Sequence, residues 1–422
     1  MACSYYQLKK HPGRFTKKMH QQNNPYKFTP LFYSLAQTFY WGSMAIINGY
    51  TAVYLTSKGV SNTVIGTVVS LSTIIAIAIQ LSLSSVLDKR PKTLSKVPVV
   101  ILTSLSTLSI ALMLIFPENA TTILAFYTIA LTLDKSSNSM LSTVSVKSDI
   151  HVAFGIPRML GSGAYAVTSL CIGRLVDSLG ASYLMYIYIP ICACTALSMI
   201  FMREDHIETP PPKKDSSSAS YFSILKGNRI LRIFLVAVVL IGIGQSSCIT
   251  FLIRIIEDCG GGTTQLGNAM FIQSFSEVPM LMLMATVFKD SRKDKLLIVS
   301  FLAYSVRIIT LSFATVLPVV YLAASLNSVS VGIFSAASIS FANIISKEEE
   351  KARCQALTVL AGSGGLGSVI GGMLSGVLLD TFGTRQTFFI GGSLCFVAFL
   401  IMIYISRLYG KTLKDSNTTA AV

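Results

Sequence analysis

Twelve long apolar segments follow one another along the chain, and they restrict its fold more than any other feature. They lie near residues 29–55, 62–86, 96–116, 122–147, 153–176, 182–202, 229–254, 264–288, 295–315, 317–345, 353–379 and 385–408. Each segment is long enough to cross a hydrocarbon core of about 30 Å as an α-helix. The apolar residues are continuous and do not alternate with polar ones, as the strands of a membrane barrel would require. We therefore predict an all-α, polytopic membrane protein embedded in the lipid bilayer by twelve transmembrane helices.

Charge is scarce and unevenly placed. Only 13% of the 422 residues are charged, whereas soluble domains carry about 25%. The formal net charge of +15 would suggest nucleic acid as a partner of a soluble protein. Here, most lysines and arginines fall in the termini and the even-numbered connections, which the positive-inside rule assigns to the cytoplasm. We expect a multi-pass protein of the plasma or inner membrane with both termini cytoplasmic, and no nucleic-acid partner.

A polar stretch with three prolines and a serine run, residues 203–228, separates the helices into two sets of six. It predicts bundles at 29–202 and 229–408, with cytoplasmic segments at 1–28 and 409–422. An internal repeat supports this division, because residues 173–180 (GRLVDSLG) match residues 376–383 (GVLLDTFG). Parallel six-helix repeats are typical of transporters with a site near the midplane. We assign the repeated aspartates, Asp177 and Asp380, to conformational gating.

A few ionisable residues interrupt the apolar helices. Arg307 lies within AYSVRIITLSFAT, where a charge costs about 2.5 kcal/mol or more on insertion scales. We expect Glu277 and Arg307 to form a charged site in the second half, with Arg158 facing them from the first. The alternative is a structural ion pair that joins helices without touching substrate. The adjacent Asp134 and Lys135 should point in different directions.

Other candidates are polar or aromatic residues with an ordinary alternative. Trp41 and Tyr165 could stack on a substrate ring, although most membrane aromatics serve packing or interfacial anchoring. Gln245 could bind hydroxyl groups or a neighbouring helix. Asp88 and Lys89, after the second helix, form either a latch between conformations or an ordinary basic loop.

Several familiar motifs are excluded. Residues 362–367 (GSGGLG) fit a dinucleotide pattern but lie in an apolar helix with no strand before them. Gly367 and Gly371 are better explained as small residues for close helix contact. The sequence has no P-loop, no HExxH and no catalytic constellation, so we expect neither an enzyme, nor a cofactor, nor a metal site. The four histidines lie in tails or connections, so any proton-coupling group should be a carboxylate.

Four short patches resemble the major facilitator superfamily, and within it the lactose permease-like branch of oligosaccharide:proton symporters. They are residues 305–315 (SVRIITLSFAT), 276–277 (SE), 158–161 (RMLG) with Tyr165, and 88–89 (DK). The resemblance implies the twelve-helix fold and transport. It also implies that Arg158 and Glu277 bind the hydroxyl groups of the substrate, that Tyr165 stacks on it, and that Arg307 tunes the protonation of Glu277.

The chain also departs from that branch. The positions of the family's proton-coupling histidine and glutamate in helix ten hold Asn327 and Ser330, and its lysine in helix eleven falls near Gly364. The resemblance therefore implies fold and transport but neither lactose nor the family's proton route. Glu277 becomes the leading candidate for proton coupling, followed by Asp134.

We predict a monomeric secondary transporter that moves a small polar metabolite, such as an oligosaccharide or a nucleoside, by alternating access. The proton is its expected co-substrate. Two alternatives remain open at this point. One is an antiporter that exports drugs or metabolites, and the other is a non-transporting receptor or scaffold.

Overall fold

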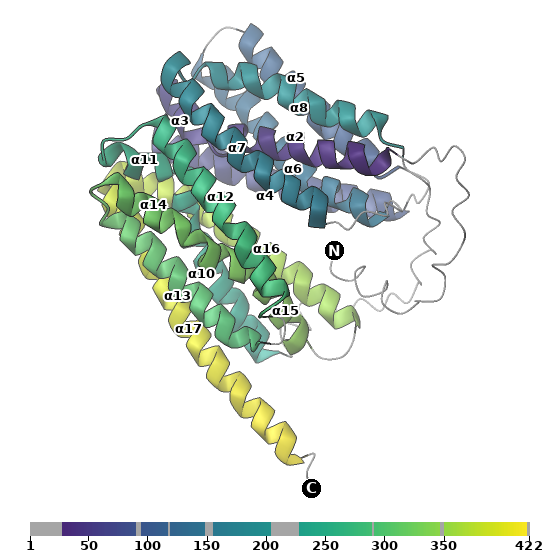
Figure 1. Cartoon of the computed structure of the whole chain (residues 1–422), viewed down its shortest axis with the longest axis vertical. Coiled ribbons are helices and arrows are strands. Elements are labelled where there is room, and N and C mark those ends of the chain that lie inside the picture. The colour runs from purple at the N-terminus through teal and green to yellow at the C-terminus, as the bar shows by residue number, and fades with distance from the viewer. Residues whose placement is uncertain are drawn as a thin grey trace. The chain divides into compact units, whose positions relative to one another are not determined.

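The computed structural model describes residues 28–89, 94–116, 119–147, 155–203, 228–288, 291–346 and 350–419. At positions 88–89, 146–147, 155–156, 350–355 and 412–419 only the backbone is described. The predicted N-terminal segment and the linker lie almost wholly outside these residues, as do the last residues of the tail. Every regular element in the described part of the chain is a helix (Figure 1).

All twelve predicted segments coincide with helices. The first half comprises α2 (Thr29–Ile47), α3 (Thr51–Ser57), α4 (Asn62–Lys89), α5 (Lys96–Ile115), α6 (Ala120–Lys147), α7 (Gly155–Leu179) and α8 (Tyr183–Phe201). The second half comprises α10 (Arg229–Thr250), α11 (Leu252–Asp258), α12 (Thr263–Ala285), α13 (Lys293–Ser312), α14 (Leu317–Ser325), the π-helix η2 (Ser328–Gly332), α15 (Ile333–Ile345), α16 (Glu350–Phe382) and α17 (Thr384–Thr419). Three predicted segments are broken: α2 is followed by α3, α10 by α11, and α14 by η2 and α15.

Nine of the helical stretches among the described residues are long and apolar enough to cross a membrane. The helices α2, α6 and α12 have the length but are more polar. Two of them carry carboxyl groups predicted for proton coupling, Asp134 in α6 and Glu277 in α12. Other predicted site residues, such as Arg158 in α7 and Arg307 in α13, lie in helices of the apolar set.

The chain divides into two compact units. The first comprises Met1–Lys58, Leu71–Ile172 and Ser178–Ser216, and the second comprises Gly59–Ser70, Gly173–Asp177 and Ser217–Val422. The beginning of α4 and a short part of α7 thus belong with the C-terminal helices. The predicted bundle boundaries remain a prediction.

Tyrosines join α2 to α6 within the first unit. The Tyr33 hydroxyl donates to the carbonyl oxygen of Leu141 at 3.1 Å, and the Tyr40 hydroxyl donates to that of Asp134 at 3.0 Å. Both rings are buried in a core that also contains Met140 and Met199. The hydroxyl groups satisfy their hydrogen-bonding capacity without water, as burial in an apolar environment requires.

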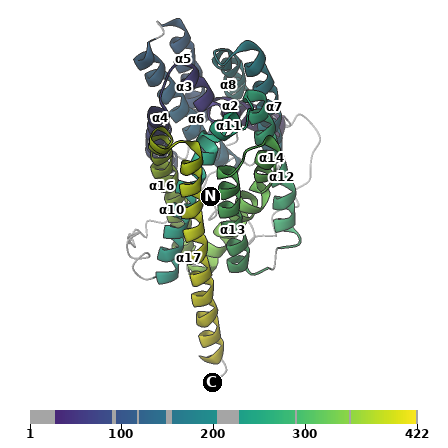
Figure 2. The ribbon, with the colours of Figure 1, turned by 90° about the vertical axis from the view of Figure 1, so that its left-hand side faces the viewer.

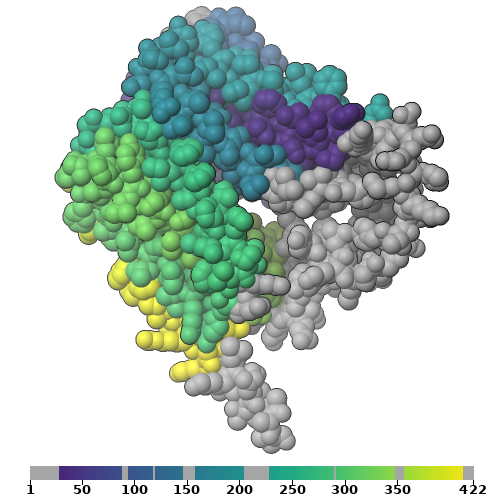
Figure 3. Space-filling model, in the orientation of Figure 1, coloured from purple at the N-terminus to yellow at the C-terminus, as the bar shows by residue number. Residues whose placement is uncertain are grey.

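In the second unit, α13 lies beside α17, whose C-terminal part extends beyond its neighbours (Figures 1 and 2). The Ser305 hydroxyl of α13 donates to the carbonyl oxygen of Gly392 in α17 at 3.0 Å. In Figure 3 the atoms of the green helices of this unit form one continuous area of the face that is shown.

Glycines allow α10 and α16 to approach closely. A Cβ added at Gly242 would lie 2.9 Å from the Cα of Gly367, and one added at Gly371 would lie 2.6 Å from the carbonyl oxygen of Ile243. Real Cβ atoms essentially never come this near to backbone atoms. The prediction that Gly367 and Gly371 serve close helix contact is confirmed.

This packing makes Gly371→Val destabilising. The added side chain meets the backbone of α10, and overpacking of this kind costs about 1–3 kcal/mol. We expect the melting temperature of the detergent-purified protein to fall by several degrees. Gly362→Val is the matched control in the same helix, because a Cβ at Gly362 meets nothing within 4 Å. Equal melting temperatures for the two variants would contradict the close contact.

Candidate functional site

Three of the predicted binding residues lie together in the first unit. The guanidinium carbon of Arg158 lies 3.9 Å from the centroid of the Trp41 ring, which is a close cation–π contact. The Tyr165 ring meets the same indole edge-on, with 6.4 Å between centroids. Arg158 also donates from Nη1 to the hydroxyl of Ser162 at 2.9 Å. One turn of α2 and two turns of α7 thus bring two aromatic rings and a cation to one place.

A residue that the sequence analysis missed fixes the tryptophan. The indole Nε1 of Trp41 donates to Oε1 of Gln37 at 3.1 Å. Gln37 lies one turn earlier on α2 and is 2% exposed. The i,i+4 spacing of a glutamine and a tryptophan on one helix face was the available signal.

Asp134 and Lys135 face apart, as predicted. The Asp134 side chain is fully buried, and its Oδ1 accepts from the hydroxyls of Tyr188 at 3.3 Å and Ser43 at 3.5 Å. Its Oδ2 has no hydrogen-bond partner among the described residues. Lys135 instead donates to the hydroxyls of Thr73 at 2.8 Å and Ser72 at 3.1 Å. Among the described residues only hydroxyls donate to the Asp134 carboxyl, so no cation hydrogen-bonds to its ionised form to offset the cost of burial.

Arg307 is 1% exposed and is held by a neutral group. Its Nη1 donates to Oδ1 of Asn327 at 2.5 Å, while its Nε has no partner among the described residues. It forms no ion pair within 4.0 Å with any side chain that the structure describes. Asn327, one of the departures from the resembling branch, is therefore the direct partner of the buried cation.

The surroundings of Asn327 are irregular. Its Nδ2 donates weakly to the carbonyl oxygen of Gln273 in α12 at 3.4 Å. The π-helix η2 begins at the next residue, and single π turns occur frequently at functional sites. Glu277 follows Gln273 by one turn of α12 and is half-buried.

Among the described residues Arg307 bonds to Asn327, and the role of the predicted charged site of Glu277 and Arg307 remains a prediction. Arg158 belongs to the other unit, so the expected cavity shared with it remains a prediction as well.

Gln245 on α10 is half-buried, and its amide oxygen has no hydrogen-bond partner among the described residues.

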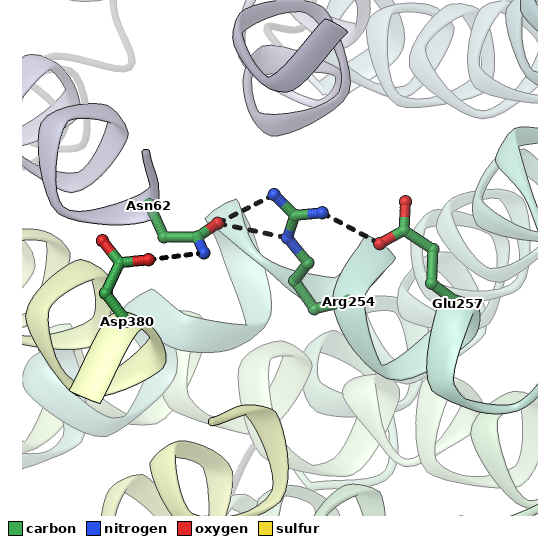
Figure 4. A network of polar contacts seen from close by, with 4 residues as sticks. All are labelled: Asn62, Arg254, Glu257 and Asp380. Atoms are coloured by element: carbon green, nitrogen blue, oxygen red, sulfur yellow. Dashed lines mark hydrogen bonds and ion pairs between the residues drawn. The ribbon is translucent and has the colours of Figure 1, made fainter. Parts of the chain in front are cut away.

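Asp380, near the end of α16, binds the first turn of α4 in the second unit. Its carboxylate accepts from the backbone N–H of Thr63 at 2.7 Å, from the Thr63 hydroxyl at 2.6 Å and from Nδ2 of Asn62 at 2.9 Å. Arg254 donates from Nε and Nη2 to Oδ1 of Asn62, and its Nη1 pairs with Glu257 at 3.0 Å (Figure 4). A carboxylate at a helix N-terminus also interacts favourably with the helix dipole.

The repeat-related Asp177 makes the equivalent contact at α12. Its Oδ2 accepts from the hydroxyl of Thr264 at 3.0 Å, and the neighbouring Thr263 donates to the carbonyl oxygen of Gly173 at 3.0 Å. The repeat ends in Gly180 and Gly383, whose φ angles are +93° and +83°. Glycine adopts this left-handed conformation readily, and it terminates both helices in the same way.

The other predicted gating residues, Asp88 and Lys89, lie at the end of α4 with their side chains outside the described residues. The sequence analysis assigned no role to Asn62, Thr63 or Arg254. Polar residues at a helix start were the signal for the first two.

Residues 31–390 match the model of the MFS_1 like family. No curated protein matches the chain in sequence. Several solved structures share its fold at low identity, and each covers almost the whole chain.

The nucleoside transporter NupG superposes with a TM-score of 0.73 and 16% identity, covering 91% of this chain and 100% of its own. A bacterial homologue of the human lysosomal transporter Spinster, inward-facing and unoccupied, gives 0.69 and 12%, covering 92% and 99%. An auto-inhibited peptide transporter of the POT family gives 0.71 and 11%, covering 90% and 96%.

The helices and the structural neighbours agree with the major facilitator fold that the sequence predicted, and the neighbours are transporters rather than enzymes. Because the family model covers most of the chain, this protein belongs to the MFS_1 like family and is a multi-pass membrane transporter of the major facilitator type.

Proposed function

We propose that this protein transports a small polar metabolite that bears hydroxyl groups, of the size of an oligosaccharide or a nucleoside, together with a proton. It would act as a monomer in the plasma or inner membrane, with both termini in the cytoplasm. The observation that carries the proposal is the cluster of Trp41, Arg158 and Tyr165 inside the membrane-spanning helices. Arg158 lies near the start of the membrane-spanning stretch of α7, where a charge is costly unless it is paired or serves binding.

The chemistry of this cluster suits a ring with hydroxyl groups. A guanidinium has several N–H donors in one plane, and Arg158 uses one of them for Ser162. Aromatic faces pack against the apolar face of a sugar or against a nucleobase. Glu277 and Gln245 of the second unit would supply acceptors for further hydroxyl groups. The nucleoside transporter among the structural neighbours adds support for the nucleoside class.

Proton coupling would use two of the carboxyl groups within the helices, Asp134 and Glu277. Asp134 is fully buried and accepts hydrogen bonds only from hydroxyls among the described residues. The titratable groups near it are Tyr40 of α2, Lys135 of α6 and both Tyr188 and Cys192 of α8. Lys135 points to α4, so proton uptake is the direct way to neutralise Asp134. Arg307 would keep its charge fixed on Asn327 and influence Glu277 from a distance.

Gating would use the repeated aspartates. Asp380 accepts three hydrogen bonds from α4, and Asp177 accepts one from α12. Positive-inside counting assigns these ends to the outer face, so both contacts would hold the transporter closed to the outside. Asp88 and Lys89 would act in the same way at the cytoplasmic end of α4.

Transport by purified protein in liposomes tests the function. With an inward proton gradient, we expect accumulation of uridine or lactose, and we expect Asp134→Asn or Glu277→Gln to abolish accumulation while leaving exchange of preloaded substrate. Removing the carboxyl group removes the proton carrier but keeps the shape of the side chain. Asp258→Asn is the control, because Asp258 is exposed at the end of α11.

Accumulation at the wild-type level in both variants would rule out these carboxyl groups as proton carriers. An absence of flux for both compounds in the wild-type protein would rule out the proposed substrate class.

Asp380→Asn should open the outer end more than Asp177→Asn, because three hydrogen bonds are weakened instead of one. The readout is labelling of a cysteine at position 70 by a membrane-impermeant maleimide, in a background without reactive native cysteines. Ser70 is 5% exposed and donates to the carbonyl oxygen of Val369, so it reports on the contact of α4 with α16. We expect several-fold faster labelling in Asp380→Asn. Equal rates in both variants and the parent would be inconsistent with a gating role for these aspartates.

A further inference from the structure

The single tryptophan of the chain lies at the end of a buried chain of hydrogen bonds. Trp41 donates to Gln37, whose Nε2 donates to the Tyr33 hydroxyl at 2.8 Å, and Tyr33 donates to the carbonyl oxygen of Leu141 at 3.1 Å. Gln37 and Tyr33 are 2% and 1% exposed. Each polar group in this series of hydrogen bonds has a partner. The N–H of the indole is therefore held in one direction relative to the backbone of α6.

A glycine holds the same ring from α7. A Cβ added at Gly161 would lie 2.4 Å from Cδ1 of Trp41 and 3.1 Å from both its Cγ and its Nε1. Any side chain at this position would displace the indole. Gly161 follows Arg158 by three residues, and residues at this spacing share one helix face. One face of α7 therefore presents both the bare backbone that seats the ring and the cation that covers it.

These two contacts leave the indole little freedom. The hydrogen bond to Gln37 fixes the direction of Nε1, and the backbone at Gly161 fixes the position of the five-membered ring. The Arg158 guanidinium is held by its hydrogen bond to Ser162 and by its contact with the indole, 3.9 Å from the ring centroid, and a displaced ring would remove the second of these. The position of the cation thus depends on residues that do not touch it.

We propose that Gln37 and Gly161 are positioning residues that orient Trp41 and, through it, Arg158, and so determine how well the site binds a hydroxyl-bearing substrate. The proposal rests on the proposed function, because it assumes that Trp41 and Arg158 contact substrate. Preorganised binding groups raise affinity by lowering the ordering cost of the complex. Loss of this order should therefore weaken binding more than it slows translocation.

Gln37→Met tests the first residue. Methionine is close to glutamine in size. The change removes the bond to the indole and also the bond from Gln37 to the Tyr33 hydroxyl, which keeps its acceptor on Leu141. Because Trp41 is the only tryptophan, its fluorescence reports on this ring alone in the full-length protein. We expect faster acrylamide quenching and a shifted emission maximum. The KM for uridine uptake should rise at least fivefold, while the maximal rate changes less than twofold.

A double-mutant cycle separates positioning from a general structural effect. In a Trp41→Phe background there is no indole N–H, so Gln37→Met should have no further effect on KM. For the second residue, Gly161→Ala should alter the tryptophan emission, and Gly163→Ala should not, because a Cβ at Gly163 meets nothing within 4 Å.

Unchanged emission and quenching in both Gln37→Met and Gly161→Ala would overturn the positioning role, whether or not uridine is transported. Altered emission together with an unchanged KM for both uridine and lactose would overturn the link to substrate binding. A wild-type protein that transports neither compound would contradict the proposed function, and the fluorescence would still decide whether Gln37 and Gly161 orient the ring.

Discussion

The hydrocarbon interior offers no water, so every polar group inside the helices needs a partner from the protein itself. This constraint explains most of the hydrogen bonds in the structure. Tyr33 and Tyr40 donate to backbone carbonyls of α6, and Arg307 donates to Asn327. Four buried side-chain atoms among the described residues have no hydrogen-bond partner, and they belong to Asp134, Gln245, Gln273 and Arg307. Three of these four residues were already site candidates, so buried side-chain atoms without a hydrogen-bond partner occur mainly in residues for which a function was predicted.

Close packing and polar contacts stabilise different parts of the second unit. Gly242, Gly367 and Gly371 let α10 and α16 meet backbone to backbone, which suits helices that gain little from hydrophobic burial in lipid. At the ends of helices, where water is near, helices are joined by hydrogen bonds that involve a charged group. Examples are the bonds between Asp380 and Thr63 and between Arg254 and Asn62. The internal repeat encodes the polar contacts, since each copy has an aspartate that binds a helix start, and each copy also has a glycine that ends its own helix.

The sequence was sufficient to predict the helices, because the length of an apolar segment decides whether it can span the membrane. It did not predict the breaks after α10 and α14, because the apolar run continues across them. Buried charges such as Arg307 and Asp134 were found because they are rare in such helices. Gln37 and Asn62 were missed because their signals, a spacing of four residues from Trp41 and a place at a helix start, are too general to single out a binding partner. The sequence showed that Asn327 stands where the resembling lactose permease-like branch has a histidine. It did not show that Asn327 bonds to Arg307.

The central claim is that the polar groups inside these helices bind a hydroxyl-bearing substrate. Thermal unfolding of the detergent-purified protein against sugars, nucleosides, aromatic acids and hydrophobic cations tests it most directly, because a ligand that binds only the native state stabilises it by about 2.7 kcal/mol at a hundredfold excess over Kd. We expect an upward shift in melting temperature with one hydroxyl-rich class, and we expect Arg158→Ala to abolish it. A shift with hydrophobic cations alone, or a shift that persists in Arg158→Ala, would contradict the claim.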